Sequence, residues 1–166
     1  LYSNFGALLG DNDPTQLQYY AKAIQTDMYF PYSYTNRASY YRRMGDFSDY
    51  VINDLTTALM LLPHDKNILN NRGDTYMHRQ EYRLAIQDFD LVIQFYPDFG
   101  DAYSNRGAAY AYIGNNQAAL ADLLKAVKLG DESGLAYYNL GVLLHQDRQY
   151  IAALYCYNKA LEINPN

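Results

Sequence analysis

The sequence is organised around a short motif that returns at a fixed interval: Asn71-Arg72-Gly73, Asn105-Arg106-Gly107 and Asn139-Leu140-Gly141. The glycines of this motif are 34 residues apart. Related triplets stand earlier in the chain, at 36–38 and 4–6, displaced from that period by one or two residues. Self-similarity at such a period predicts a repeat architecture, in which each repeat is one supersecondary unit that stacks on its neighbours.

Further residues recur at fixed places after the motif. In the repeat that starts at Lys66 they are Tyr76, Ala85, Phe89 and Pro97. A small residue, then Tyr, Ala, an aromatic residue and Pro within 34 residues resembles the tetratricopeptide repeat family. The resemblance covers essentially the whole chain and implies a single domain of five tandem units, at about 1–30, 31–65, 66–99, 100–133 and 134–166.

Each unit carries two apolar stripes at helical spacing. Asp13 and Pro14 are typical of an N-cap and a first helical residue. The resemblance implies an all-α, right-handed α-solenoid of antiparallel helix pairs, with the first helix of each pair lining the concave side. Helices are expected over about 1–9, 14–27, 31–44, 49–62, 66–79, 83–96, 100–113, 117–130, 134–147 and 151–164.

Composition excludes several classes of protein. The chain has 13 Lys and Arg residues and 18 Asp and Glu residues, which gives a net charge of −5. This negative charge argues against general nucleic-acid binding. No apolar run approaches the ~20 residues that cross a membrane. The lone cysteine, Cys156, excludes an internal disulfide and a Cys-rich zinc site. We expect the chain, which starts at Leu1, to be a fragment of a longer protein; its compartment stays open, with a slight preference for the cytoplasm.

No catalytic constellation is present in the sequence, which contains no G-x-S-x-G, H-E-x-x-H, P-loop or G-x-G-x-x-G motif. The histidines are spread over three units: His64 falls in a turn, and His78 and His145 fall late in the concave helices. Cys156 lies in an apolar stretch that favours packing over nucleophilic chemistry. We therefore expect no enzyme activity, no cofactor and no metal.

Arginine and aspartate appear together and disappear together when the units are compared. Arg37, Arg72 and Arg106 share one place, and Asp54, Asp88 and Asp122 share another. In the last unit these places hold Leu140 and Cys156. Because removing one partner would leave a partly buried charge unpaired, the pattern predicts ion pairs between the two helices of a unit. A row of arginines that faces a ligand would not explain the matched loss of Asp.

One asparagine per unit is expected on the concave side. The amide of this asparagine offers hydrogen-bond donors and an acceptor, which suits a peptide backbone. The arrangement resembles an asparagine ladder of the family, which holds an extended peptide. A helix-to-helix hydrogen bond is the alternative. The lysines of the family's two-carboxylate clamp are missing, so a chaperone C-terminal tail is not the expected ligand. The candidate groove residues are Asn36, Asn71, Asn105, Asn139, Tyr32, Asn67, Asn70, Asp74, Met77, His78, Tyr112 and Tyr138.

The resemblance implies a non-enzymatic scaffold that binds an extended peptide or a partner helix in its concave groove. The partner is therefore a protein or peptide, with no nucleic acid and no membrane insertion. Two alternatives stay open: a regulatory or substrate-recruiting segment of a larger enzyme, and a self-assembly module. Repeat arrays need a polar outer face at their ends, so the apolar last helix, over about 151–164, is expected to face a missing capping helix or another molecule. Self-association through this helix is one of these possibilities.

Overall fold

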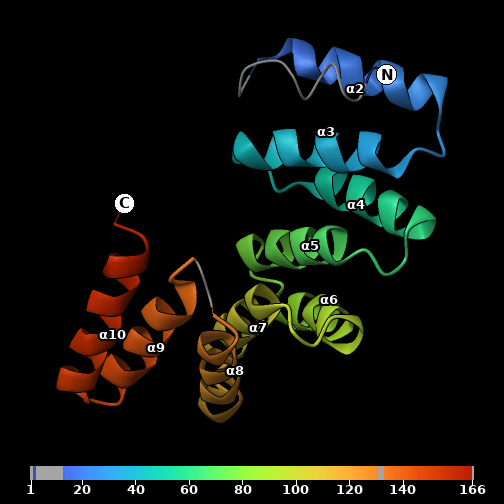
Figure 1. Ribbon diagram of the computed structural model, residues 1–166. Helices are drawn as coiled ribbons and strands as arrows, with labels where there is room; N and C mark the ends of the chain where they lie inside the picture. Colours follow the sequence, from blue (N-terminus) through green and yellow to red (C-terminus); the bar gives the residue numbers. More distant parts are fainter. Residues whose placement is uncertain (1, 3–12, 131–132, 166) are drawn as a thin grey trace. The chain divides into compact units, whose positions relative to one another are not determined.

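The computed structural model describes residue 2 and residues 13–130 and 133–165, which form α-helices and no strands (Figure 1). The predicted helix over 1–9 lies, apart from Tyr2, outside the described residues. The other predicted helices are confirmed, with ends that differ by one or two residues. They are α2 (Thr15–Thr26), α3 (Pro31–Arg43), α4 (Asp49–Leu61), α5 (Lys66–His78), α6 (Tyr82–Phe95), α7 (Gly100–Tyr112), α8 (Asn116–Lys128), α9 (Leu135–Gln146) and α10 (Tyr150–Ile163).

The chain divides into two compact units, Leu1–Gln80 and Glu81–Asn166. In the first unit, α2 packs on α3, α3 on α4 and α4 on α5. In the second unit, consecutive helices from α6 to α10 pack in the same way, and α7 also contacts α9. This packing of consecutive helices confirms the expected all-α fold of stacked helix pairs.

Small residues stand where two helices approach closely. A Cβ atom added to Gly107 would lie 2.8 Å from Cγ of Leu123, and one added to Gly141 would lie 2.6 Å from the ring of Tyr157. Both distances are shorter than van der Waals contact, so a larger residue would push the helices of a pair apart. The recurring glycine of the motif therefore sets the spacing within a pair.

The core of the second unit joins two successive pairs. Ala119, Leu123 and Ala126 of α8 form one cluster with residues of α9 and α10. Leu123 and Ala126 are completely buried, which is why a large apolar residue and a smaller one recur at these places in the sequence. Burial of such side chains is the main favourable term in repeat stacking.

Side chains also satisfy some helix ends. Asp65 accepts hydrogen bonds from the backbone N–H groups of Asn67 and Ile68, and Asn115 accepts one from Ala118. Asp13 accepts from the backbone N–H of Thr15 at 2.9 Å. Within the described part of the chain, no helix is both long and apolar enough to cross a membrane.

Candidate functional site

Two of the three predicted ion pairs are confirmed. Nε and Nη2 of Arg37 each donate to the carboxylate of Asp54, at 2.7 Å. Arg106 binds Asp122 in the same bidentate way, at 2.7 and 2.8 Å. The predicted pair of Arg72 with Asp88 would join the two units and stays a prediction. Arg37 and Arg106 thus serve structure within a repeat and are not free to hold a ligand.

Arg106 has a second acidic partner that the sequence comparison missed. Its Nη1 donates to Asp90 of the preceding repeat at 2.6 Å. Although burial opposes its charge, hydrogen bonds to Asp122 and Asp90 raise the pKa of Arg106. One repeat later all three places are uncharged: Leu140, Cys156 and Leu124. A charged triad has been replaced as a unit, as expected where a single buried charge would be costly.

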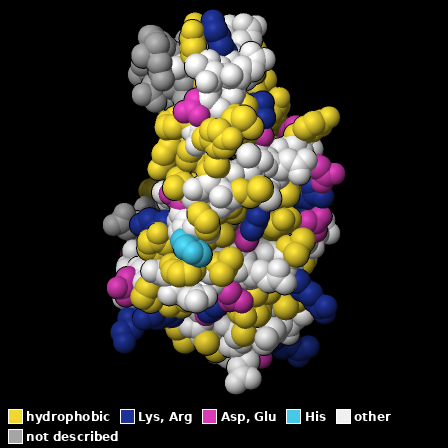
Figure 2. Space-filling model, turned by 90° about the vertical axis from the view of Figure 1, so that its right-hand side faces the viewer, with side chains coloured by type: hydrophobic (Ala, Val, Ile, Leu, Met, Phe, Trp, Pro, Cys, Tyr) yellow, Lys and Arg dark blue, Asp and Glu magenta, His cyan; other side chains and the backbone are white. Residues whose placement is uncertain are grey.

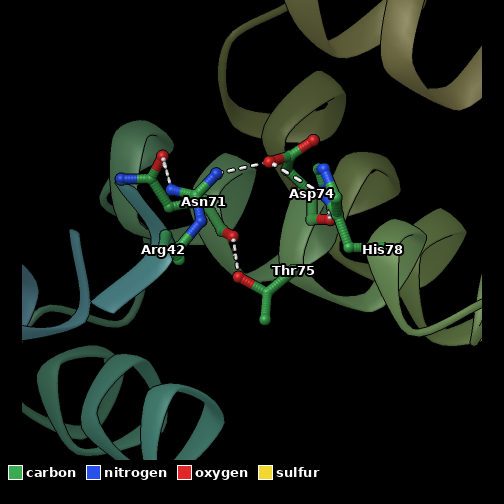
Figure 3. A network of polar contacts seen from close by, with 5 residues as sticks. All are labelled: Arg42, Asn71, Asp74, Thr75 and His78. Carbon is green, nitrogen blue, oxygen red and sulfur yellow. Dashed lines mark hydrogen bonds and ion pairs between the residues drawn. The ribbon is translucent and has the colours of Figure 1, made fainter. Parts of the chain in front are cut away.

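The first unit holds a polar network that links α3 to α5 (Figure 3). Nη1 of Arg42 donates to Oδ1 of Asn71 at 2.8 Å, and Nη2 forms an ion pair with Asp74. The hydroxyl of Thr75 donates to the backbone carbonyl of Asn71 at 2.7 Å. For Asn71 the structure thus favours the alternative that the sequence left open, a helix-to-helix hydrogen bond.

His78 ends this network on the surface. Its Nδ1 lies 2.9 Å from the backbone carbonyl of Asp74, and its ring stacks on Phe47 with 4.0 Å between centroids. The sequence singled out Asn71, Asp74 and His78 but not Phe47 or the role of Arg42. Arg42 has no counterpart in the other repeats, so the period gave no signal for its contacts. The stack of His78 on Phe47 does recur one repeat later, as the stack of Tyr112 on Tyr82, but the sequence comparison did not pair these places.

The second unit places the equivalent asparagine in different surroundings. Asn139 of α9 corresponds to Asn71, but Ala111 of α7 stands where Arg42 stands in α3. The Nδ2 atom of Asn139 is buried and has no hydrogen-bond partner among the described residues. A buried donor of this kind costs free energy until an acceptor reaches it.

An apolar pocket of about 400 Å³ lies between the start of α9 and the end of α10. Tyr138, the residue before Asn139 in the sequence, is one of the residues that line it. Leu135 and Tyr138 of α9 line one side, and Tyr157 and Leu161 of α10 line the other. The side chain of Tyr138 is 53% exposed, and its ring lies 6.0 Å from that of Tyr157. An aromatic ring at the edge of an apolar hollow is a common anchor for a peptide side chain.

The other predicted groove residues are more dispersed. Tyr112 of α7 is exposed and stacks on Tyr82 at 4.8 Å, while Tyr32 of α3 makes an edge contact with Phe30. Of the remaining predicted groove residues, four are half-buried and one is exposed. The half-buried ones are Asn36, Asn70, Met77 and Asn105, and the exposed one is Asn67.

The surface of the described residues mixes charged and apolar side chains. On the face drawn in Figure 2, acidic and basic side chains are interspersed with apolar ones. Among the residues that the structure covers, no group of three His, Cys, Asp or Glu side chains could hold a metal ion. Burial raises the pKa of the Cys156 thiol, which disfavours the nucleophilic thiolate.

Helix pairs that stack in sequence order, with a small residue at each close approach, define a helical-repeat protein. The tetratricopeptide repeat model matches residues 100–129 and again residues 134–166. Residues 100–129 and 134–166 are thus tetratricopeptide repeats, and the tetratricopeptide repeat fold is generally a scaffold for protein–protein interaction. No curated protein matches it in sequence.

Solved structures share the fold at low sequence identity. A MamA chain from Desulfovibrio magneticus RS-1 has a TM-score of 0.84 at 19% identity, covering 99% of this chain and 93% of its own. PilF from Pseudomonas aeruginosa has a TM-score of 0.84 at 18% identity, with 98% and 75% covered. YrrB, a tetratricopeptide repeat protein with an unusual peptide-binding site, has a TM-score of 0.76 at 20% identity, with 99% and 86% covered. These likenesses concern the fold alone.

Proposed function

We propose that the chain is a non-enzymatic interaction module that binds an extended peptide along the first helices of its repeats. The central part of the site is the second unit, where α9 presents Asn139 and Tyr138. The observation that carries the proposal is that α9 combines the apolar pocket edged by Tyr138 with the amide nitrogen of Asn139, which has no acceptor among the described residues.

The chemistry of these two residues suits a peptide. Once its side chain turns outward, the amide of Asn139 can donate to a backbone carbonyl without giving up a bond of that nitrogen to any described residue. The pocket beside Tyr138 can take one apolar side chain of the same peptide. Side chains of successive residues on a helix diverge by about 100°, so the two contacts fall on adjacent faces of one turn of α9, and a peptide that crosses this turn can make both.

Asn105 of α7 can add a second amide contact. Packed helices lie ~10 Å apart and an extended peptide rises ~3.3 Å per residue, so one asparagine per repeat meets every third peptide residue. Each such hydrogen bond contributes ~0.5–1.5 kcal/mol, which gives modest affinity without the aromatic anchor. We therefore expect Tyr138 to set specificity and the asparagines to set register.

The test is capture of peptides from an array by the wild-type chain and by variants. Asn139→Ala should weaken binding by about 2- to 10-fold, as expected for one lost hydrogen bond. Tyr138→Ala should remove the preference for an apolar side chain in the peptide. Asn53→Ala, at an exposed asparagine of α4, is the matched control and should bind as the wild type does.

Circular dichroism should show that all variants keep their helix content and melting temperature. Equal capture of the same peptides by wild type, Asn139→Ala and Tyr138→Ala would refute the site.

A further inference from the structure

The outer face of α10 carries four residues at the spacing of a two-stranded coiled coil. Ile151, Leu154, Asn158 and Leu161 follow one another at intervals of three or four residues, which is the a–d–a–d pattern of two heptads. All four are exposed: Ile151 is 89%, Leu154 60% and Leu161 58% accessible. We propose that this α10 seam binds the α10 seam of a second copy of the chain, which goes beyond the peptide-binding function.

The seam lies at the end of the described stack. One repeat earlier, Leu123 and Ala126 of α8 are completely buried and Val127 is half-buried, because α9 packs on α8. The residue that corresponds to Val127 is Leu161, which no described helix covers to the same extent. Of the seam residues, only Leu161 thus belongs to the surface that packs on the next helix one repeat earlier. The counterparts of Ile151, Leu154 and Asn158 on α8 are exposed as well; they are Gln117, Leu120 and Leu124.

The seam differs from the same places in the other second helices of this unit. Its first residue, Ile151, stands where α6 has Arg83 and α8 has Gln117. Its third residue, Asn158, stands where α6 has Asp90, which is paired with Arg106. Ile151, Leu154 and Leu161 are exposed along one side of α10, and an exposed apolar surface of this kind marks an interaction site.

The charge of α10 favours a second copy as that partner. The chain carries −5 overall, so two copies repel each other over most of their surface. The charged residues of α10 are Lys159 and Glu162, which pair with each other at 2.5 Å. Contact through this neutral helix therefore avoids most of the repulsion.

Asn158 sets the expected register. A two-fold interface places the same patch of each copy against the other. In a parallel, in-register pair, Asn158 lies opposite Asn158 of the other copy, and the two amides can donate to and accept from each other. An asparagine at one central a position is a known device for fixing two strands in parallel.

The test measures association of the wild-type chain by analytical ultracentrifugation across a concentration series. Because two heptads make a short seam, we expect a monomer–dimer equilibrium with a dissociation constant of about 1–100 µM. Leu154→Glu and Ile151→Lys should each weaken association at least about 10-fold. Met60→Glu, at a side chain that is 78% exposed on α4, is the control and should leave association unchanged.

A cross-link tests the register directly. With Cys156→Ala as background, Asn158→Cys should form a disulfide-linked dimer under mild oxidation, because the two cysteines would face each other in a parallel pair. Tyr50→Cys, which is also exposed, should not do so to the same extent.

Three results would overturn the proposal. The first is that the wild-type chain stays monomeric at about 500 µM. The second is that the Leu154→Glu and Met60→Glu variants associate equally well. The third is that the seam binds only a helix of another protein. Peptide capture by Tyr138 and Asn139 variants is measured separately, so failure of the dimer leaves the peptide site intact.

Discussion

Arg106 and Leu140 occupy the same place in successive repeats, and their partners change with them. Arg106 binds Asp122 and Asp90, whereas Leu140 is 4% exposed and belongs to one apolar cluster with Cys156. Both sets of side chains fill the equivalent space between the helices of their own repeats. The charged set is stabilising only when every partner is present, because an unpaired carboxylate as buried as that of Asp122 lowers the free energy of unfolding.

Replacing Arg106 alone should therefore be severe. Arg106→Leu leaves Asp122 buried and unpaired, with an expected loss of about 3–5 kcal/mol in the free energy of unfolding. The triple variant Arg106→Leu, Asp122→Cys, Asp90→Leu copies the chain's own apolar solution and should recover most of that loss. Urea denaturation followed by circular dichroism measures both. A triple variant no more stable than Arg106→Leu would show that the three residues do not act as a unit.

At the scale of elements, the connection between α8 and α9 contains two glycines with positive φ, Gly130 and Gly134, and only the second is also crowded by another helix. Gly134 precedes α9 with a φ of +75°, a conformation that glycine adopts without a steric penalty. A Cβ added there would also lie 2.9 Å from the backbone carbonyl oxygen of Ala160 in α10. The loop conformation and the packing of α9 on α10 thus constrain the same residue.

A matched pair of variants separates these two effects. Gly114→Ala has the same left-handed backbone, with φ +78°, and open space around the new Cβ, so it should cost about 1–2 kcal/mol. Gly134→Ala should cost a further ~1–3 kcal/mol, because backbone atoms cannot move as a flexible side chain does. Chemical denaturation of the two variants tests this. Equal losses would mean that α10 yields to the added methyl group.

At the scale of the whole molecule, stability should follow the stacking of neighbours. In the second unit α8 packs against both α7 and α9, whereas α10 packs against α9. Repeat proteins draw their stability from intrinsic repeat terms and nearest-neighbour interfaces, so an end helix opens more often than an internal one.

Hydrogen exchange should report this gradient. At a protein concentration well below that of self-association, amides of α10 should exchange faster than those of α8. Mass spectrometry of peptides from 116–128 and 150–163 gives the comparison. Protection of α10 that equals that of α8 in the dilute monomer would contradict nearest-neighbour stacking. Protection of α10 that rises with concentration would agree with pairing through the α10 seam.

The amino-acid sequence alone determined the helices, their repeat and the pairs of Arg37 with Asp54 and Arg106 with Asp122. These features are local or recur once per repeat, so one chain contains several copies of the same signal. The expected concave groove, its asparagine ladder and the self-association of the last helix remain predictions from that repeat.

Only the tertiary structure decided which side chains of neighbouring repeats meet. It linked Arg42 to Asn71 and Asp74 and brought Asp90 to Arg106. It also left the amide nitrogen of Asn139 without a partner among the residues that the structure describes. These contacts differ from repeat to repeat because they depend on the residues that happen to face each other across a helix interface. A period shows where helices lie, whereas the distance between two side chains is fixed only when the helices are packed.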